Sequence, residues 1–247
     1  MKIGYAVTYH YSENRPENLD KIALDSISSF YDSCKYNFNA YIIDNQSEPK
    51  NSFTDLIDIT TENMCYTYIE DQYEKGITGA WNLSIKQSIE DDCDLIVLAG
   101  EDIIFDDTLN NLLEYAISDE FNNNSMYVPV ASNIAHPSHQ LSDGPTGQIY
   151  QVPGVRWGEH ISPIVLVFSK EFYHAYSDDN GDLFQVENKY NGGDGKWGGQ
   201  EGNIMHWAEQ GMKCIVVGTS WVQHMSISAQ TKTGSWRTAR AKDRGEA

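Results

Sequence analysis

Short apolar runs that end abruptly in polar residues alternate with amphipathic segments through the first half of the chain. The apolar runs are strand-sized, and the amphipathic segments carry apolar residues at close to helical spacing, as at Ile22, Leu24, Ile27 and Phe30. Expected strands cover residues 2–8, 39–43, 65–69 and 94–99, and expected helices cover residues 19–31, 79–90 and 107–117. Near-continuous apolar strands that alternate with helices predict an α/β fold, with a mostly parallel sheet and helices on both faces.

The second half of the chain is less regular. Expected strands cover residues 126–132, 164–168 and 214–217, the last of them ending near Trp221 to His224, and an expected helix covers residues 203–211. A stretch rich in Gly, Pro and His at 136–160 predicts a long loop, and residues 188–202 contain six glycines. The expected organisation is one domain over residues 1–228, built from halves at 1–125 and 126–228, and a flexible basic tail at 229–247.

The balance of charge is strongly acidic. The chain has 247 residues, with 36 Asp and Glu against 17 Lys and Arg, and a formal net charge of −19. Hydrophobic residues make up 40% of the chain, which is enough for a core and excludes a disordered polyacid. General nucleic-acid binding is not expected, because it needs clustered basic residues. A nucleotide ligand is still compatible with this charge, because a metal ion can supply the positive charge.

Cysteine spacing and the lack of targeting segments point to a reducing compartment. Cys34, Cys65, Cys93 and Cys214 form no CxxC pair, which favours reduced thiols over a zinc site. The amino-terminal segment has no basic region followed by a long apolar stretch, so no signal peptide is expected. The longest apolar runs are far shorter than a membrane span. We therefore expect a soluble cytoplasmic protein, from a microbe or a virus-infected host cell.

Two polar positions that follow apolar strands suit a divalent cation. Glu101 and Asp102 follow the fourth expected strand, and hard cations take carboxylate oxygens. His224 follows another apolar run, and a carboxylate together with an imidazole suits Mn²⁺. Each has a plainer interpretation. The acidic pair could be a polar loop that begins the next helix, with Asp106-Asp107 as its N-cap, and His224 could be structural or solvent-exposed.

Further features are ambiguous when each is taken alone. Glu201 lies between a glycine-rich segment and a helix, where a carboxylate could act as a general base or stabilise the helix dipole. Residues 44–47 could bind the edge of a nucleobase or form an Asx turn. Trp157 and Trp197 could stack on a base or a sugar, or belong to core or surface. The basic tail could cover a diphosphate or be disordered.

Taken in order, these segments resemble the motifs of GT-A glycosyltransferases, especially the inverting family 2 and its relatives. Asn14-Arg15-Pro16 matches the segment that follows the family's first strand, Asp44-Asn45-Gln46-Ser47 its DNxS element, and Gly79-Ala80-Trp81-Asn82 its G…A.N helix start. Gly100-Glu101-Asp102 stands at its DXD-type metal motif, Trp197-Gly198-Gly199-Gln200-Glu201 at its WGGED segment, and His224 at a metal-binding His of some members. These segments span most of residues 1–225. The resemblance implies a Rossmann-like GT-A fold with a nucleotide-binding first half and a smaller acceptor-side second half.

The same resemblance implies an activity. A sugar would pass from a UDP-sugar to a hydroxyl acceptor, a glycan or another small acceptor, with inversion at the anomeric carbon. Asp102 and His224 would hold Mn²⁺ or Mg²⁺ beside the two phosphates. Asp44 would accept a hydrogen bond from the uracil N–H, with Thr8 and Tyr9 beside the base.

The remaining roles also come from the resemblance. Glu201 would deprotonate the acceptor hydroxyl, and Glu101 would contact the ribose or a metal-bound water. The basic tail is a further candidate for phosphate contacts. Other donor-binding candidates are Asn82, Arg156, Trp157 and Trp197.

Two departures from the family pattern keep other functions open. The DXD-type motif is Gly-Glu-Asp here, and the family's Glu-Asp is Gln-Glu, so that Glu201 falls on the position of the catalytic Asp. A non-catalytic relative that binds nucleotides or glycans is therefore one alternative. A sugar nucleotidyltransferase is another, although the residues after the first strand, Thr8-Tyr9-His10-Tyr11, lack its GxGxR loop.

Overall fold

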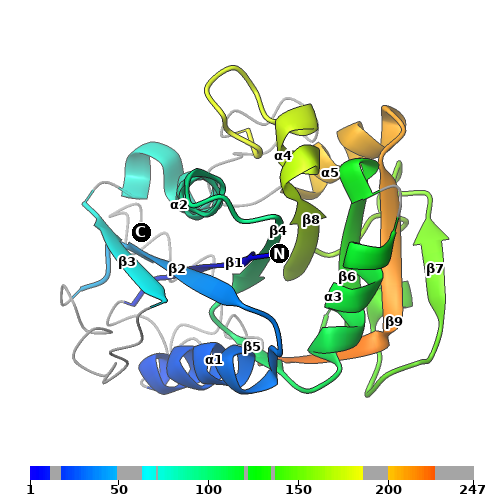
Figure 1. The fold of residues 1–247 in the computed structure, drawn as a ribbon, viewed down its shortest axis with the longest axis horizontal. Helices are drawn as coiled ribbons and strands as arrows, with labels where there is room; N and C mark the ends of the chain where they lie inside the picture. The colour runs from blue at the N-terminus through cyan, green and yellow to red at the C-terminus, as the bar shows by residue number, and fades with distance from the viewer. Residues whose placement is uncertain are drawn as a thin grey trace, which may run out of the picture.

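One sheet organises the described part of the chain. The computed structural model describes residues 1–11, 18–48, 63–70, 72–119, 122–134, 137–185 and 200–225. Nine strands form the sheet in the order β3-β2-β1-β4-β8-β6-β9-β5, with β7 paired to β9 (Figure 1). Within these residues, no helix combines the length and the apolar character needed to cross a membrane.

The first half of the sheet is parallel, as predicted. Its strands are β1 (Ile3–Tyr9), β2 (Phe38–Asn45), β3 (Met64–Ile69) and β4 (Leu95–Gly100). The connecting helices are α1 (Leu19–Ser33) and α2 (Gln72–Glu90). α2 starts earlier than predicted because two helical pieces join across a bend at Gly76, whose φ is 61°.

The second half of the sheet is mixed. β8 (Val165–Ser169) runs antiparallel to β4 and to β6 (Ser125–Ala131), and β6 runs parallel to β9 (Lys213–His224). The other side of β9 pairs antiparallel with β7 (Ile149–Val152) and then with β5 (Ile103–Phe105). The remaining helices are α3 (Leu109–Ser118), α4 (Lys170–Tyr176), α5 (Gln200–Glu209) and two 3₁₀ turns, η1 (Asn122–Asn124) and η2 (Ser138–Gln140). The prediction of a mostly parallel sheet therefore describes the first half better than the second.

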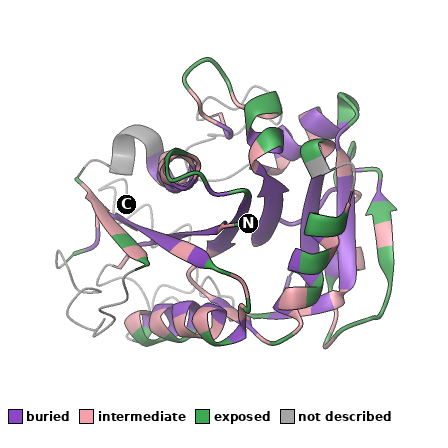
Figure 2. Cartoon of the chain, in the orientation of Figure 1, coloured by how far each residue is buried: buried purple, intermediate pink, exposed green. Residues whose placement is uncertain are grey.

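Helices cover both faces of the sheet. Successive side chains of a strand point to opposite faces. In β1, Tyr5 and Val7 join a core with α1 and α3, whereas Ala6 joins a second core with α2, α4 and α5. Figure 2 shows the central strands buried between these layers, with exposed residues on the outer sides of the helices. The predicted α/β layering is confirmed.

β9 changes its register halfway along its length. Val217 pairs with Pro129 of β6, but the next β6 residue, Val130, pairs with Trp221. Residues 218–220 therefore form a bulge. A bulge bends a strand and changes the direction of the residues after it. Beyond the bulge, β9 pairs with β6 again and reaches the edge of the sheet where β6 ends.

The carboxyl ends of the parallel strands meet at one edge. β1, β2, β3, β4, β6 and β9 all end there, and β8 begins there, as their relative directions require. In open α/β sheets ligands bind at this edge. The predicted site residues at the ends of β1, β2 and β9 and just after β4 therefore gather on one side of the molecule.

Candidate active site

The ends of β4 and β9 bring Asp102 and His224 together. β4 ends at Gly100 and β5 begins at Ile103, so Asp102 lies in the corner between these strands, and His224 pairs with Ile103. Asp102 Oδ2 and His224 Nε2 are 3.2 Å apart, and the side chains of His224 and Asp102 are 17% and 15% exposed. The structure thus places the two predicted metal ligands next to each other.

The surroundings of His224 favour a cation at its ring. Burial by itself lowers the pKa of His224, but the hydrogen bond to Asp102 and the charges of Asp102 and Glu101 outweigh burial, so the pKa is raised. On the other side of the ring, Nδ1 is 3.3 Å from the carbonyl oxygen of Asn133. The imidazole therefore has an oxygen acceptor near each nitrogen, which suits a bound proton or a metal ion.

The donor set fits a hard or borderline divalent cation. One carboxylate oxygen and one imidazole nitrogen suit Mn²⁺, which accepts both. Among the residues that the structure describes, no group of three or more His, Cys, Asp or Glu side chains could hold a metal ion. A site with two protein ligands leaves coordination positions for phosphate oxygens and water, as in metal sites that act on phosphate substrates. The pair fits that arrangement better than a closed structural site.

Glu201 lies in the first turn of α5. The neighbouring Gln200 is buried and donates from Nε2 to Thr78 Oγ1 at 2.7 Å, which fixes the start of α5 against α2. Burial raises the pKa of Glu201, opposed by a hydrogen bond to its own backbone. A carboxylate of raised basicity suits proton abstraction, and a carboxylate in a first turn also stabilises the helix dipole.

Asp44, the residue predicted to bind uracil, is fully buried and engaged within the protein. Its Oδ1 accepts from the backbone N–H of Ser47 at 2.8 Å, and its Oδ2 accepts from the hydroxyl of Tyr66 at 2.5 Å. The first bond closes the turn after β2, which is the turn-forming alternative for residues 44–47. Each carboxylate oxygen can accept a second hydrogen bond, so the predicted contact of Asp44 with the uracil N–H stays a prediction.

Thr8 and Tyr9 differ in what their side chains can contact. The ring of Tyr9 is buried in the core with α1, and its hydroxyl donates to Asp20. Thr8 is 2% exposed, and its buried Oγ1 has no hydrogen-bond partner among the residues that the structure describes. The contacts of Thr8 and Tyr9 with a base stay predictions.

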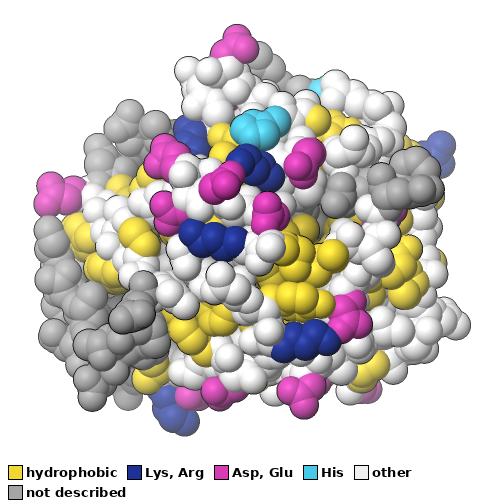
Figure 3. Space-filling model, viewed as in Figure 1, with side chains coloured by type: hydrophobic (Ala, Val, Ile, Leu, Met, Phe, Trp, Pro, Cys, Tyr) yellow, Lys and Arg dark blue, Asp and Glu magenta, His cyan; other side chains and the backbone are white. Residues whose placement is uncertain are grey.

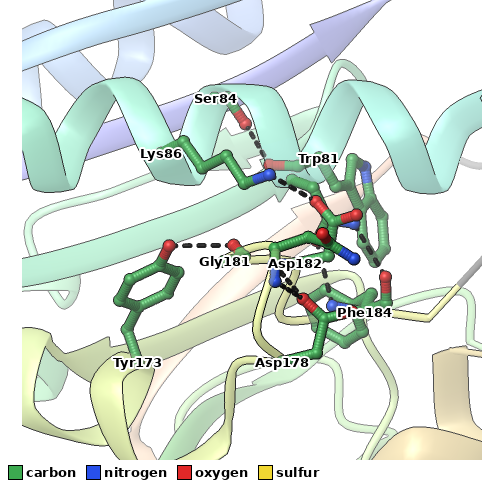
Figure 4. A network of polar contacts seen from close by, with 10 residues as sticks. Trp81, Ser84, Lys86, Tyr173, Asp178, Gly181, Asp182 and Phe184 are labelled. Atoms are coloured by element: carbon green, nitrogen blue, oxygen red, sulfur yellow. Dashed lines mark hydrogen bonds and ion pairs between the residues drawn. The ribbon is translucent and has the colours of Figure 1, made fainter.

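Both ends of the Asn82 side-chain amide form hydrogen bonds with the backbone of Phe184. Nδ2 donates to the carbonyl oxygen of Phe184 at 2.7 Å, and Oδ1 accepts from the Phe184 N–H at 2.9 Å. One turn further along α2, Lys86 Nζ is 2.6 Å from Asp182 Oδ1, and Asp178 Oδ1 accepts from the backbone N–H of Asp182 (Figure 4). These contacts fasten residues 178–184 to α2. The structure thus gives Asn82 a loop-holding role, and its donor contact stays a prediction.

Arg156 and Trp157 lie on the surface after β7. Arg156 is exposed, and Trp157 is 63% exposed, with its ring stacked on His160 at 4.7 Å between centroids. His160 is itself buried and accepts from the backbone N–H of Gly158 at 3.0 Å, so the tryptophan rests on a fixed ring. The roles of Arg156 and Trp157 in donor binding stay predictions.

Several predicted features fall outside the described residues. They are Asn14-Arg15-Pro16, Trp197 with Gly198 and Gly199, and the basic tail. Glu101 is described, lies half-buried beside Asp102 and adds to the negative charge around His224. Its predicted contact with the ribose or a metal-bound water stays a prediction.

One residue next to Asp102 and His224 was not predicted from the sequence. Asn133 follows β6, has a φ of 54°, and contacts His224 through both its side chain and its carbonyl group. The sequence signal for Asn133 was its place directly after the expected apolar strand at 126–132. Since Asn is common in turns, that signal did not point to the site.

Comparison with known proteins gives a match in fold and none in sequence. No protein-family model and no curated protein matches the chain. The crystal structure of GalNAc-T7 with UDP, GalNAc and Mn²⁺ is similar with a TM-score of 0.65 at 12% identity, over 90% of this chain and 43% of that chain. S. aureus TarS 1–349 has a TM-score of 0.60 at 12% identity, over 92% of this chain and 61% of that chain.

A second crystal structure of TarS 1–349, in complex with UDP, has a TM-score of 0.58 at 12% identity and covers 90% of this chain and 60% of that chain. The chain thus spans between 43% and 61% of the length of these proteins. These similarities show that the chain has the GT-A fold of glycosyltransferases, as its motifs predicted.

Proposed function

We propose that this protein is a metal-dependent glycosyltransferase that moves a sugar from a UDP-sugar to a hydroxyl acceptor, with inversion. The observation that carries the proposal is the Asp102–His224 pair at the carboxyl edge of a GT-A sheet. Similar folds crystallised with UDP, and in one case with UDP, GalNAc and Mn²⁺, support the choice of donor and cation.

Asp102 and His224 would hold Mn²⁺ or Mg²⁺, which would neutralise the charge of a diphosphate and stabilise UDP as the leaving group. The chain itself carries a net charge of −19 and has 17 Lys and Arg in all. A cation at this pair explains how so acidic a protein could bind a nucleoside diphosphate.

Glu201 is the candidate general base. Its carboxylate would accept the proton of the acceptor hydroxyl while the hydroxyl oxygen attacks the anomeric carbon and the bond to UDP breaks. Burial raises the pKa of Glu201, which makes it a stronger base than an exposed glutamate. The hydrogen bond from Gln200 to Thr78 supports this role, because it fixes the start of the helix that carries Glu201.

For the nucleoside, Asp44 would accept a hydrogen bond from the uracil N–H with a lone pair that Ser47 and Tyr66 leave free, and Thr8 and Tyr9 would lie beside the base. Thr8 pairs with Gly100 of β4, and a Cβ at position 100 would lie 3.1 Å from Asp102 Oδ1. The glycine therefore keeps side-chain atoms out of the space beside Asp102. A ligand at the end of β1 would then lie next to the Asp102–His224 pair.

The experiment that tests the proposal is a turnover screen of UDP-sugars with Mn²⁺, with Mg²⁺ and with EDTA, which measures the release of UDP. We expect release from at least one UDP-sugar with metal and none with EDTA. UDP binding that requires metal but leads to no release, with a range of hydroxyl acceptors present, would favour a non-catalytic relative of the fold. No response to any nucleotide sugar would overturn the proposal.

A further inference from the structure

The end of β9 is held by the turn that follows β6. The Ser132 backbone N–H donates to the carbonyl oxygen of Val222 at 3.2 Å, and the His224 N–H donates to Ser132 Oγ at 3.1 Å. The pairing of β6 with β9 is therefore continued beyond the end of β6 by a side chain. On the opposite side of β9, His224 pairs with Ile103, and the Met225 N–H donates to the carbonyl oxygen of Asp102 at 2.8 Å.

Asn133 contacts His224 at two points. Asn133 Nδ2 donates to the carbonyl oxygen of His224 at 3.2 Å, and the Asn133 carbonyl oxygen is 3.3 Å from His224 Nδ1. A carbonyl oxygen can only accept, so this contact is a hydrogen bond when Nδ1 carries the hydrogen. The nitrogen left to bind a metal is then Nε2, which is the atom that faces Asp102.

The direction of the Asn133 carbonyl depends on an uncommon backbone conformation. Asn133 has a φ of 54°, in the left-handed region that Asn and Gly adopt more readily than other residues. The side chain of Asn133 is exposed, so packing does not explain the choice of residue. A residue that avoids this region would turn the carbonyl away from the imidazole.

We propose that Asn133 is a positioning residue whose carbonyl group, set by the left-handed turn after β6, orients the ring of His224 and presents Nε2 to the cation. This inference rests on the proposed function, because it assumes that His224 is a metal ligand. Outer partners of metal-binding histidines act in this way: they fix the tautomer and the orientation of the ring, and changing them weakens metal binding.

The test compares substitutions at position 133 that differ in their backbone preference. Asn133→Gly keeps access to the left-handed turn and therefore keeps the carbonyl in place, whereas Asn133→Val disfavours that turn. Asn133→Ala is a milder version of the second change, for use if the valine variant does not fold. The measurements are the affinity for Mn²⁺ alone, from the electron paramagnetic resonance signal of free Mn²⁺, and the melting temperature in EDTA.

We expect Asn133→Val to weaken Mn²⁺ binding by about 10- to 100-fold, and Asn133→Gly to retain most of the wild-type affinity. Turnover of the valine variant should recover as Mn²⁺ is raised, which a purely structural defect would not do. The matched control is Asp92→Val, because Asp92 has a φ of 58° in an exposed turn on another part of the molecule. It should lower the melting temperature and leave Mn²⁺ affinity unchanged.

Three results would overturn the inference. Equal losses in the glycine and valine variants would assign the effect to the Asn133 side chain and not to its carbonyl group. Wild-type Mn²⁺ affinity in the valine or alanine variant would reduce Asn133 to a structural residue while leaving the proposed function intact. A wild-type protein that binds no Mn²⁺ would overturn the proposed metal dependence itself, and the two failures are thus distinguishable.

Discussion

Glu201 combines two properties that oppose each other. Its side chain is largely shielded from water, and burial raises its pKa because the ionised form is poorly solvated there. Proton abstraction needs the ionised form, which is the form that this environment stabilises less. Such a conflict between stability and chemistry is common at active sites, and it makes Glu201 testable in two independent ways.

The first test concerns turnover. Glu201→Gln should lower the rate of sugar transfer by about 100- to 10,000-fold, the usual contribution of general acid–base catalysis, with UDP affinity nearly unchanged. Rates of UDP release and UDP dissociation constants check this. Glu209→Gln, an exposed change at the other end of α5, is the matched control and should turn over normally. Normal turnover in Glu201→Gln would show that another group is the base.

The second test concerns stability and pH. Since the pKa of Glu201 is higher in the folded than in the unfolded state, its stabilising contribution is fully present below the unfolded pKa and is lost as pH rises through the folded pKa. Glu201→Gln keeps this position neutral, so it should melt at a higher temperature than the wild type at neutral pH. This difference in melting temperature between the variant and the wild type should disappear as the pH is lowered. Melting curves between pH 5 and 8 check this, and equal melting temperatures at pH 8 would contradict it.

At the scale of single elements, β9 shows how a bulge brings a distant residue to the site. Its residues from Lys213 to Val217 pair with β6 and β7, and the residues after the bulge pair with β6 and β5. Gly218 stands where the bulge begins. A Cβ there would lie 2.1 Å from Thr146 Oγ1 and 2.4 Å from the carbonyl oxygen of Gln148, so the position requires glycine.

Gly218→Ala should therefore force residues 146–148 away from β9. We expect a loss of about 1–3 kcal/mol in the free energy of unfolding, the usual effect of overpacking. Gly144→Ala is the matched control, because a Cβ at Gly144 would meet nothing within 4 Å, and it should stay within about 0.5 kcal/mol of the wild type. Urea unfolding of the wild type and the two variants checks this. Equal free energies of unfolding would mean that residues 146–148 can move away from β9 without a cost in stability.

The two hydrogen bonds between Asn82 of α2 and the backbone of Phe184 allow a similar test. Asn82→Ala would leave the buried N–H and carbonyl groups of Phe184 without their partners, which should cost about 1–3 kcal/mol. Urea unfolding measures this loss, and Asn180→Ala, an exposed change in the same loop, is the control. If Asn82→Ala instead kept full stability and raised the KM for the donor, Asn82 would be the donor contact that the sequence predicted.

The sequence was most informative where elements are regular and buried. β1, β2, β4 and α1 were predicted within about two residues because their apolar periodicity reflects the layers that they join. β5 has three residues, β7 has four of which only Val152 is buried, and α4 has seven; none of these leaves a clear pattern. For β9, the apolar core at 214–217 and an end near Trp221–His224 were predicted, but the polar bulge between them was not.

Among the site residues, too, some contacts could be predicted from the sequence and others could not. The meeting of Asp102 and His224 was predictable, because Asp102 follows β4, His224 ends β9, and both strands end at the same sheet edge. The engagement of Asp44 by Tyr66 and the contact of Asn133 with His224 depend on side chains from other strands and on a backbone angle. Local sequence patterns carry no information about such partners.

At the scale of the whole molecule, charge and fold together define what the site can bind. On the face that Figure 3 shows, Lys and Arg side chains stand singly, most of them beside Asp or Glu. The net charge of −19 would repel a diphosphate at long range. In the proposed function, a cation held where the parallel strands end offsets this repulsion, so binding of UDP is expected to depend on that cation.

The most direct measurement is calorimetric titration of UDP into the wild type and two variants, Asp102→Asn and His224→Ala, with Mn²⁺ and with EDTA. We predict that the wild type binds UDP with Mn²⁺ and loses at least about 100-fold in affinity with EDTA, and that both variants bind as weakly with Mn²⁺ as the wild type does without it. His174→Ala, an exposed change on α4, should bind like the wild type. UDP binding of equal strength in EDTA, or unaltered metal-dependent binding in both variants, would contradict a cation site at Asp102 and His224.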